Sequence, residues 1–227
     1  MTNRIVLPGD VVAEGRFRIG ENVYRLSNKI IASRVGLARI EKGVVSVIAL
    51  HSFYMPQKGD TVIGIIEDIG ITNWSVDINS PYVAVLPATS IFKRNFDPVK
   101  HDLKSELDIG DVIIAEILQF DRTIDPILGF KSREHGKVKD GLVVEMTPSK
   151  IPRLIGRKAS MLNMIQKKTG CKLFIGQNGR VLIHSQDKAM IDLVVKVIRR
   201  IEREAHVSGL TDRISKMLDE GMERRTK

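Results

Sequence analysis

The stretch Leu154-Ile155-Gly156-Arg157-Lys158-Ala159-Ser160-Met161-Leu162 is the most informative part of the sequence. It places a glycine and two basic residues before residues 160–169, whose apolar spacing is helical and ends at Gly170. Glycine lets a ligand backbone approach closely, and the amides at a helix N-terminus attract phosphate. The stretch therefore predicts a phosphate-binding turn at the start of a helix, with Arg153, Gly156, Arg157 and Lys158 as its expected contact residues.

The elements around this turn follow a recognisable order. A strand over 142–146 precedes it, and the helix after it leads to strands over 171–175 and 180–183, a long helix over 187–205 and a final helix over 210–224. Asn178-Gly179 between the two later strands predicts a type I′ hairpin turn, with positive φ at both residues.

This order resembles a type I KH domain, in which an Ile-Gly-x-x-Gly turn clamps the backbone of about four nucleotides. The resemblance implies an apolar floor under the bases, made by Ile155, Leu162 and Ile165. The second glycine of the family turn is Ala159 here. Two interpretations therefore stay open: a working RNA clamp, and a KH fold that is kept as a scaffold.

The middle of the chain, residues 56–139, predicts a five-stranded barrel. Gly59-Asp60 and Gly110-Asp111 each open a strand, and a polar connection over 93–106 precedes the fourth strand. The segment resembles an S1-type OB-fold, which binds single strands with aromatic side chains in a charged groove. Trp74 is expected in the core or at an interface. RNA contacts are expected from Lys93, Arg94, Lys100, Lys104, Asp121 and Arg122.

The predicted fold class is multidomain β and α+β. Residues 1–55 read as short strands of a small β-barrel or sandwich, 56–139 as the S1-type OB-fold barrel, and 140–227 as the type I KH domain with a C-terminal helix.

The charge is distributed unevenly along the chain. Residues 1–149 hold 18 Lys and Arg against 19 Asp and Glu, whereas residues 150–227 hold 18 against 8. The formal net charge of +9 therefore comes from the last third. Lysine and arginine that displace counterions from phosphates favour an acidic polymer as partner, and a solvated helix surface is the alternative interpretation.

Catalysis by this chain is not expected. The five histidines show no metal-ligand spacing, and neither a phosphate-cradling Gly-x-x-x-x-Gly-Lys loop nor a Gly-x-Ser-x-Gly elbow occurs. We expect no metal and no cofactor. Adjacent carboxylates such as Glu67-Asp68 point in different directions on a strand and make poor metal sites.

The three parts in this order resemble the KH-containing cap subunit of the archaeal exosome, of the ribosomal-RNA-processing protein 4 type. The family's Gly-x-Asn-Gly turn is present as Gly176, Asn178 and Gly179, with Gln177 between the first two. The resemblance implies three copies on a hexameric ring of RNase-PH-like phosphorolytic subunits, with the N-terminal domain docked on the ring. It also implies capture of single-stranded RNA, adenine-rich tails among it, whose 3′ end is guided inward for 3′-to-5′ degradation and processing.

Two other functions remain open: a free-standing RNA-binding protein in translation or ribosome assembly, and an adaptor with negligible RNA affinity. No apolar run reaches the roughly 18 residues of a membrane span, so no membrane association is expected. The lone Cys171 excludes an internal disulfide, and a cytoplasmic location is expected.

Overall fold

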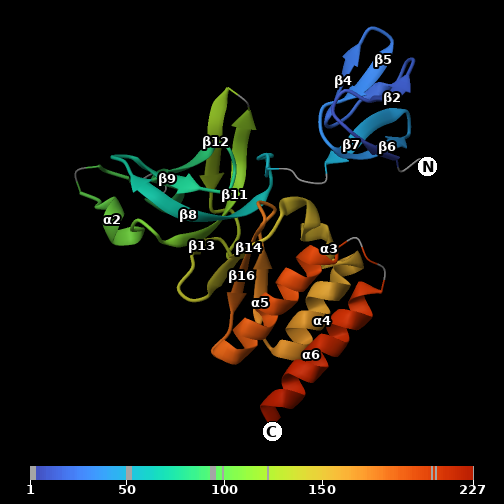
Figure 1. Cartoon of the computed structure of the whole chain (residues 1–227). Helices are drawn as coiled ribbons and strands as arrows, with labels where there is room; N and C mark the ends of the chain where they lie inside the picture. The colour runs from blue at the N-terminus through green and yellow to red at the C-terminus, as the bar shows by residue number, and fades with distance from the viewer. Residues whose placement is uncertain are drawn as a thin grey trace. The chain divides into compact units, whose positions relative to one another are not determined.

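The computed structural model describes residues 4–49, 53–92, 96–98, 100–121, 123–205, 207 and 209–226, with the backbone alone for 223–226. The chain forms two compact units, Met1–Ser52 and Phe53–Lys227 (Figure 1). The second unit contains both the barrel and the helical region, which pack on one another. The residue boundaries expected between the three domains stay a prediction.

The N-terminal unit consists of two small sheets around a core of short aliphatic side chains. Alternation along the strands places Val6, Ala38 and Val47 inside. A tight turn joins the first two strands, and there the Asp10 carboxylate accepts a hydrogen bond from the Leu7 amide at 2.9 Å. One sheet has the order β1-β6-β7-β3 and the other the order β2-β5-β4. The strands are β1 (Arg4–Val6), β2 (Val11–Glu14), β3 (Arg18–Ile19), β4 (Val23–Leu26), β5 (Lys29–Ala32), β6 (Gly36–Glu41) and β7 (Val44–Ala49).

The second unit begins with a closed barrel of five strands. They follow the order β12-β10-β9-β8-β11, and β11 pairs back with β12 to close the barrel. All pairs are antiparallel except β10 with β12, and a short strand β13 is added to the edge of β11. The strands are β8 (Thr61–Ile69), β9 (Asn73–Asp77), β10 (Val83–Pro87), β11 (Val112–Asp121), β12 (Ile124–Gly129) and β13 (Gly136–Lys137). The predicted S1-type OB-fold is confirmed.

Trp74 is the largest side chain in the barrel core. It is 0% exposed, and its indole Nε1–H donates a hydrogen bond to the carbonyl of Leu107 at 3.1 Å. Leu107 follows α2 (Leu103–Glu106), and α1 (Thr89–Phe92) lies earlier in the same connection. The bond anchors this long connection on the barrel, and the expectation that Trp74 is a core residue is confirmed.

The C-terminal part is a three-stranded sheet packed against helices, as Figure 1 shows. The sheet order β14-β16-β15 and the helices α3 and α4 between β14 and β15 are those of a type I KH domain, which confirms the prediction. The elements are β14 (Leu142–Glu145), η2 (Pro148–Lys150), α3 (Ile151–Ile155), η3 (Arg157–Ala159), α4 (Ser160–Thr169), β15 (Lys172–Ile175), β16 (Arg180–His184), α5 (Lys188–Arg203) and α6 (Leu210–Thr226).

The long helix α5 shows why the sequence pattern was informative. Its apolar stripe includes Val194, Ile198 and Ile201, all 0% exposed in the KH core. The Asp187 side chain caps the helix by accepting a hydrogen bond from the Ala189 amide at 3.0 Å. Periodicity and cap thus fix the start and the buried face of the helix.

The hairpin between β15 and β16 forms as predicted, but its turn type was predicted wrongly. Four residues, Gly176 to Gly179, connect the strands, and only Gly179 of the expected pair has a positive φ, at 84°. Asn178 does not adopt the left-handed conformation that a type I′ turn requires. Its side chain is used instead for contacts with the barrel.

Within the described residues, no helix combines the length and the apolar character needed to cross a membrane.

Candidate nucleic-acid interface

The loop Gly156–Ala159 joins α3 to α4 and exposes its two basic side chains. Gly156 has φ 75° and ψ 176°, and a Cβ at this position would lie 2.9 Å from the Met161 amide nitrogen. A side chain therefore could not fit without displacing the first turn of α4. Arg157 and Lys158 are both exposed.

Two residues of this loop have left-handed backbone conformations although they are not glycine. Lys158 has φ 50° and ψ 39°, and Ala159 has φ 59° and ψ 23°. Each costs roughly 1–2 kcal/mol relative to a right-handed conformation. Backbone strain of this kind concentrates at ligand sites, where the surrounding structure holds it in place. The substitution of Ala159 for the family glycine thus leaves the turn in place and adds strain to it.

The N-terminus of α4 faces this loop without a side-chain cap. Its first-turn amides and the positive end of its dipole therefore favour an anion. The guanidinium of Arg153, also expected to contact RNA, donates a hydrogen bond to the Val207 carbonyl at 3.0 Å. RNA contacts stay a prediction for Arg153, Gly156, Arg157 and Lys158. Arg153 in addition has the structural partner just described.

The apolar floor expected beside the loop is only partly available. Ile155 and Leu162 are half-buried, whereas Ile165 is 0% exposed inside the KH core. Helical geometry places Ile165 one turn after Met161, on the face that packs against the sheet. The expectation that Ile165 contacts bases was therefore wrong.

The turn Gly176–Gly179 binds the KH domain to the barrel. Asn178 is 0% exposed, and its Nδ2 donates to the carbonyls of Ile63 at 2.8 Å and Ile78 at 3.0 Å. Its Oδ1 accepts from the Ile63 amide at 3.2 Å. The side chain of Asn79 donates to the Asn178 carbonyl at 3.0 Å. The sequence predicted a structural turn at Gly176, Asn178 and Gly179. The hydrogen bonds show that this turn supports the contact between the KH domain and the barrel.

Both glycines of this turn are sterically required. A Cβ on Gly176 would lie 2.2 Å from the Asn178 Oδ1, and one on Gly179 would lie 2.4 Å from the Met146 carbonyl. Gln177 completes the contact, because its amide donates to the Thr61 carbonyl at 3.0 Å and its Oε1 accepts from the Thr61 amide at 2.6 Å.

Arg180, directly after the turn, is a buried cation between the two domains. It is 3% exposed, and its Nη1 donates to the Asp77 carbonyl at 2.7 Å. The guanidinium also pairs with the carboxylates of Asp77 and Glu145. A buried arginine with these partners is satisfied, so it serves the domain contact and offers nothing to RNA.

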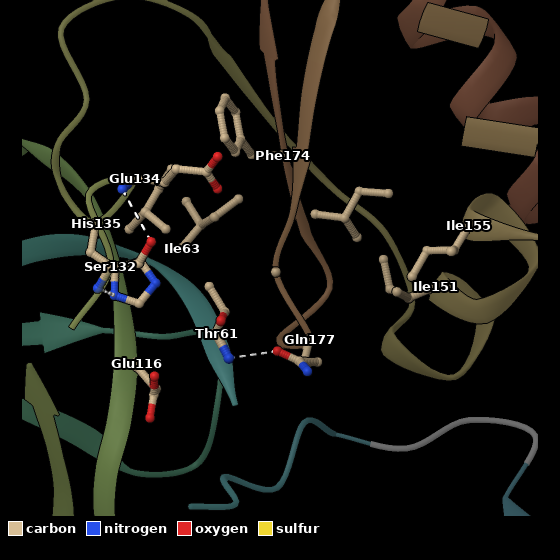
Figure 2. Close-up of a pocket in the computed structure, with 13 residues that line it drawn as sticks. Thr61, Ile63, Glu116, Ser132, Glu134, His135, Ile151, Ile155, Phe174 and Gln177 are labelled. Atoms are coloured by element: carbon tan, nitrogen blue, oxygen red, sulfur yellow. Dashed lines mark hydrogen bonds between the residues drawn. The ribbon is translucent and has the colours of Figure 1, made fainter. Parts of the chain in front are cut away.

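A pocket of about 500 Å³ lies where the barrel and the KH domain meet (Figure 2). This volume falls within the range of roughly 300–1,000 Å³ that is usual for ligand sites. The barrel contributes residues of β8, β11 and the β12–β13 connection, and the KH domain contributes α3, β15 and the start of the buried turn. The lining residues are Thr61, Ile63, Ile114, Glu116, Ser132, Glu134, His135, Ile151, Ile155, Phe174, Ile175, Gly176 and Gln177.

Of the contacts expected on the barrel, three lie within the described residues. Lys100 pairs with Asp97 at 3.5 Å but stays 79% exposed, and Lys104 is also exposed. Asp121 accepts hydrogen bonds from the amide and the hydroxyl of Thr123, both at 2.8 Å, and these lower the pKa of Asp121 below its ordinary value. Lys93, Arg94 and Arg122 lie outside the described residues. The RNA contacts of all six stay predictions.

Sequence reasoning missed the aromatic groups of the barrel and the pocket. Tyr82 and Phe120 meet edge to face with ring centroids 5.0 Å apart. Phe92 and Phe96 surround His101 in the long connection, with centroids 4.6 and 6.0 Å from the imidazole. Phe120 could have been found from the sequence, because it directly precedes Asp121, a predicted RNA contact. The sequence held no such signal for the pocket, because the residues that line it come from distant segments.

Among the described residues, no group of three or more His, Cys, Asp or Glu could hold a metal ion.

Three family models match the chain in succession. They are the exosome RNA-binding protein RRP4 N-terminal domain over residues 3–51, the S1 domain of exosome complex component RRP40 over 54–141, and the KH domain over 141–189. A crystal structure described as an exosome complex RNA-binding protein is similar with a TM-score of 0.73 and 44% identity, over 77% of this chain and 99% of that chain.

Curated relatives agree with these models along almost the whole sequence. The exosome complex component Rrp4 of Thermofilum pendens is 44% identical over 96% of this chain and 93% of its own length. The proteins of the same name from Sulfurisphaera tokodaii and Nitrosopumilus maritimus are 42% and 40% identical, over 95% of this chain and 88% and 96% of their own lengths. The chain therefore belongs to the Rrp4 family of exosome components.

Proposed function

We propose that this chain is a non-catalytic, RNA-binding cap subunit of an exosome, which captures single-stranded RNA and guides its 3′ end to a phosphorolytic RNase-PH-like ring. The observation that carries the proposal is the exposed loop Gly156–Ala159. It combines two exposed basic side chains, a glycine that permits close approach of the RNA backbone, and a helix N-terminus without a side-chain cap. These are the features by which a KH turn holds an RNA backbone.

The concentration of positive charge in residues 150–227 supports RNA as the partner. The rigid connection between the barrel and the KH domain supports a shared binding surface, because Asn178 and Arg180 fix the two domains against each other. RNA that contacts the loop therefore has a fixed path toward the barrel side of the same unit.

An exposed apolar row on the N-terminal unit supports docking on another exosome subunit. Ile5 pairs with Leu37, and Leu37 pairs with Ile48, so the three side chains share one face of the sheet. Ile5 is 65% exposed and Ile48 is 47% exposed. An apolar row of this kind is typical of a protein interface. We place three copies of the chain on the ring, and the single buried Cys171 supports a cytoplasmic location.

The RNA-binding part is tested with Arg157→Glu combined with Lys158→Glu in the full chain. Binding of a labelled 15-residue single-stranded oligoadenylate is followed by fluorescence anisotropy from about 50 to 200 mM salt. Loss of two phosphate contacts should lower the slope of log K against log salt by about 1.4, since each contact contributes about 0.7 on a single strand. The oligonucleotide should stay intact on a denaturing gel with phosphate and magnesium present.

The matched control is Lys172→Glu combined with Lys188→Glu. Both residues are exposed, the change in net charge is the same, and both follow the end of α4 that lies away from the loop. An equal loss of slope in the control would show that net charge alone binds RNA. An unchanged slope in the loop variant would favour the adaptor interpretation, and shortening of the oligonucleotide would contradict the non-catalytic role.

Docking is tested by sedimentation of the chain with the ring subunits. Ile5→Asp combined with Ile48→Asp should abolish co-sedimentation and leave oligonucleotide binding unchanged. A stable chain that binds RNA but never joins the ring would favour a free-standing RNA-binding protein.

A further inference from the structure

The pocket between the barrel and the KH domain has a floor and walls suited to a flat apolar ring. Ile63, Ile114 and Ile151 are 1%, 6% and 4% exposed, and they form its aliphatic lining. Phe174 packs against the buried apolar cluster that contains Ile63. It is half-buried and lines the pocket, so part of its ring is open to the pocket. An aromatic ring beside aliphatic side chains is a surface on which a nucleobase stacks.

The polar groups of the pocket are mainly hydrogen-bond acceptors. Two carboxylates line it, and Glu116 already pairs with Lys131 at 2.5 Å. Glu134 is exposed, and within the described part of the chain its carboxylate has no hydrogen-bond or ion-pair partner. Glu134 and Phe174 both line the pocket, and Figure 2 labels both side chains. Among the residues that the structure describes, neither lysine nor arginine lines the pocket, so a phosphate group is disfavoured inside it.

The pocket adjoins the proposed RNA-binding loop directly. Ile155 lines it, and the next residue in the chain is Gly156, the first residue of the loop. Exposed basic residues lie close in sequence to lining residues on both domains: Arg133 between Ser132 and Glu134 on the barrel, and Arg157 two residues after Ile155 in the KH domain. Phosphates held by these cations at the rim would leave a base free to turn inward.

We propose that this pocket receives a base of single-stranded RNA and favours bases that carry an exocyclic amino group. Adenine, cytosine and guanine each present an amino group that donates hydrogen bonds, whereas uracil presents a carbonyl acceptor at the equivalent position. Glu134 accepts from the amino group while the base stacks on Phe174. The base is thus selected by a residue of the barrel, although the RNA backbone is held by the KH domain. This inference rests on the proposed RNA-binding function.

The test compares single-stranded oligomers of adenine, cytosine and uracil in the full chain, by fluorescence anisotropy at one salt concentration. The wild-type chain should bind the adenine and cytosine oligomers about tenfold more tightly than the uracil oligomer. Glu134→Gln should reduce this preference to about threefold or less, because a carboxamide both donates and accepts and therefore tolerates uracil. Glu67→Gln is the matched control, since Glu67 is an exposed carboxylate of β8 outside the pocket.

A second variant tests the stacking wall separately. Phe174→Leu should weaken all oligomers by about fivefold or more and leave their order unchanged. The fluorescence of Trp74, the only tryptophan, reports whether the barrel stays folded.

The possible failures are distinguishable. Salt-sensitive binding without preference among the bases, or a preference that Glu134→Gln leaves intact, would overturn the pocket proposal and leave the loop proposal standing. RNA affinity that neither pocket variant changes would likewise overturn it, and would point to another occupant, such as an extended peptide along the edge strand β15. If no oligomer binds at all, the proposed function fails together with this inference.

Discussion

Two four-residue turns of the KH domain both begin with glycine and differ in exposure. Gly156–Ala159 exposes two basic side chains and carries backbone strain, whereas Gly176–Gly179 is inserted into the barrel with Asn178 fully buried. In the first turn, a Cβ on Gly156 would collide with the start of α4, and the proposed RNA contacts are left to the exposed Arg157 and Lys158. In the second, glycine makes room for the protein itself, because a Cβ would collide with Asn178 or Met146.

The two turns differ in their hydrogen bonds and in their backbone strain. The side chains of Asn178 and Gln177 bond to the barrel, the Gly179 carbonyl accepts from the Met146 amide within the KH domain, and burial makes these partners costly to remove. In the exposed turn no side chain caps the N-terminus of α4, and Lys158 and Ala159 adopt strained conformations. The buried turn stabilises the fold, and the exposed turn is suited to binding. Variants in the two turns should therefore act on different quantities.

The largest effect is expected from Asn178→Ala. Loss of the side chain removes its three buried hydrogen bonds with the amide and carbonyl of Ile63 and the carbonyl of Ile78, and of these groups the Ile63 carbonyl keeps the Arg180 Nη1 as a donor at 3.4 Å. We expect the free energy of unfolding of the unit 53–227 to fall by about 3 kcal/mol. Urea unfolding followed by the fluorescence of Trp74 measures this change, because the only tryptophan lies in the barrel.

Asn163→Ala is the matched control for this variant. Asn163 is exposed on α4, so the same chemical change should shift the free energy of unfolding by less than about 0.5 kcal/mol. A loss below about 1 kcal/mol for Asn178→Ala would show that the buried turn does not hold the domains together.

A smaller, pH-dependent effect is expected from Glu202→Gln. Glu202 on α5 accepts hydrogen bonds from the amide and the hydroxyl of Thr147, both at 2.8 Å. Burial acts to raise the pKa of Glu202, but the Thr147 bonds and the nearby Arg199 outweigh it and lower the pKa. Thr147 follows Met146, whose amide donates to the Gly179 carbonyl at 2.7 Å, so this carboxylate supports the buried turn.

Because the folded-state pKa is depressed, this contribution is present above the unfolded value of about 4.3 and is lost as the pH falls through the folded value. At pH 7 the variant should be about 1 kcal/mol less stable than the wild-type chain, and the gap should close as the pH falls through the lowered pKa of Glu202. Urea unfolding at several pH values measures it. A gap that is independent of pH would assign the effect to packing.

Local signals predicted most of the fold. The Gly170 stop and the apolar stripe of α5 are properties of neighbouring residues, and they located the KH helices. The paired Gly-Asp strand openings similarly located the barrel strands. Such features depend on few residues, so one sequence is enough to recognise them.

The contacts that combine the two domains could not be predicted in this way. Asn178 and Ile63 are 115 residues apart, and no local pattern indicates that an Asn-Gly pair will be buried against a barrel. The expectation of a type I′ turn failed because long-range hydrogen bonds decided the conformation of Asn178. The pocket was missed for the same reason, since Glu134 and Phe174 meet only after the domains pack.

The smallest effect is expected from Ala159→Gly, and it separates strain from fit in the exposed turn. Glycine adopts φ 59° without a Cβ penalty, so the free energy of unfolding should rise by about 0.5–1 kcal/mol. Ala189→Gly is the opposite control, because this exposed alanine begins a right-handed helix and should lose stability. Urea unfolding followed by Trp74 fluorescence measures both, and a loss of stability in Ala159→Gly would show that the alanine methyl group makes favourable contacts. If RNA affinity rises together with stability, the methyl group hinders the approach of the phosphate backbone. If affinity falls while stability rises, the alanine holds the loop ready for RNA, and its strain is the cost of that preorganisation.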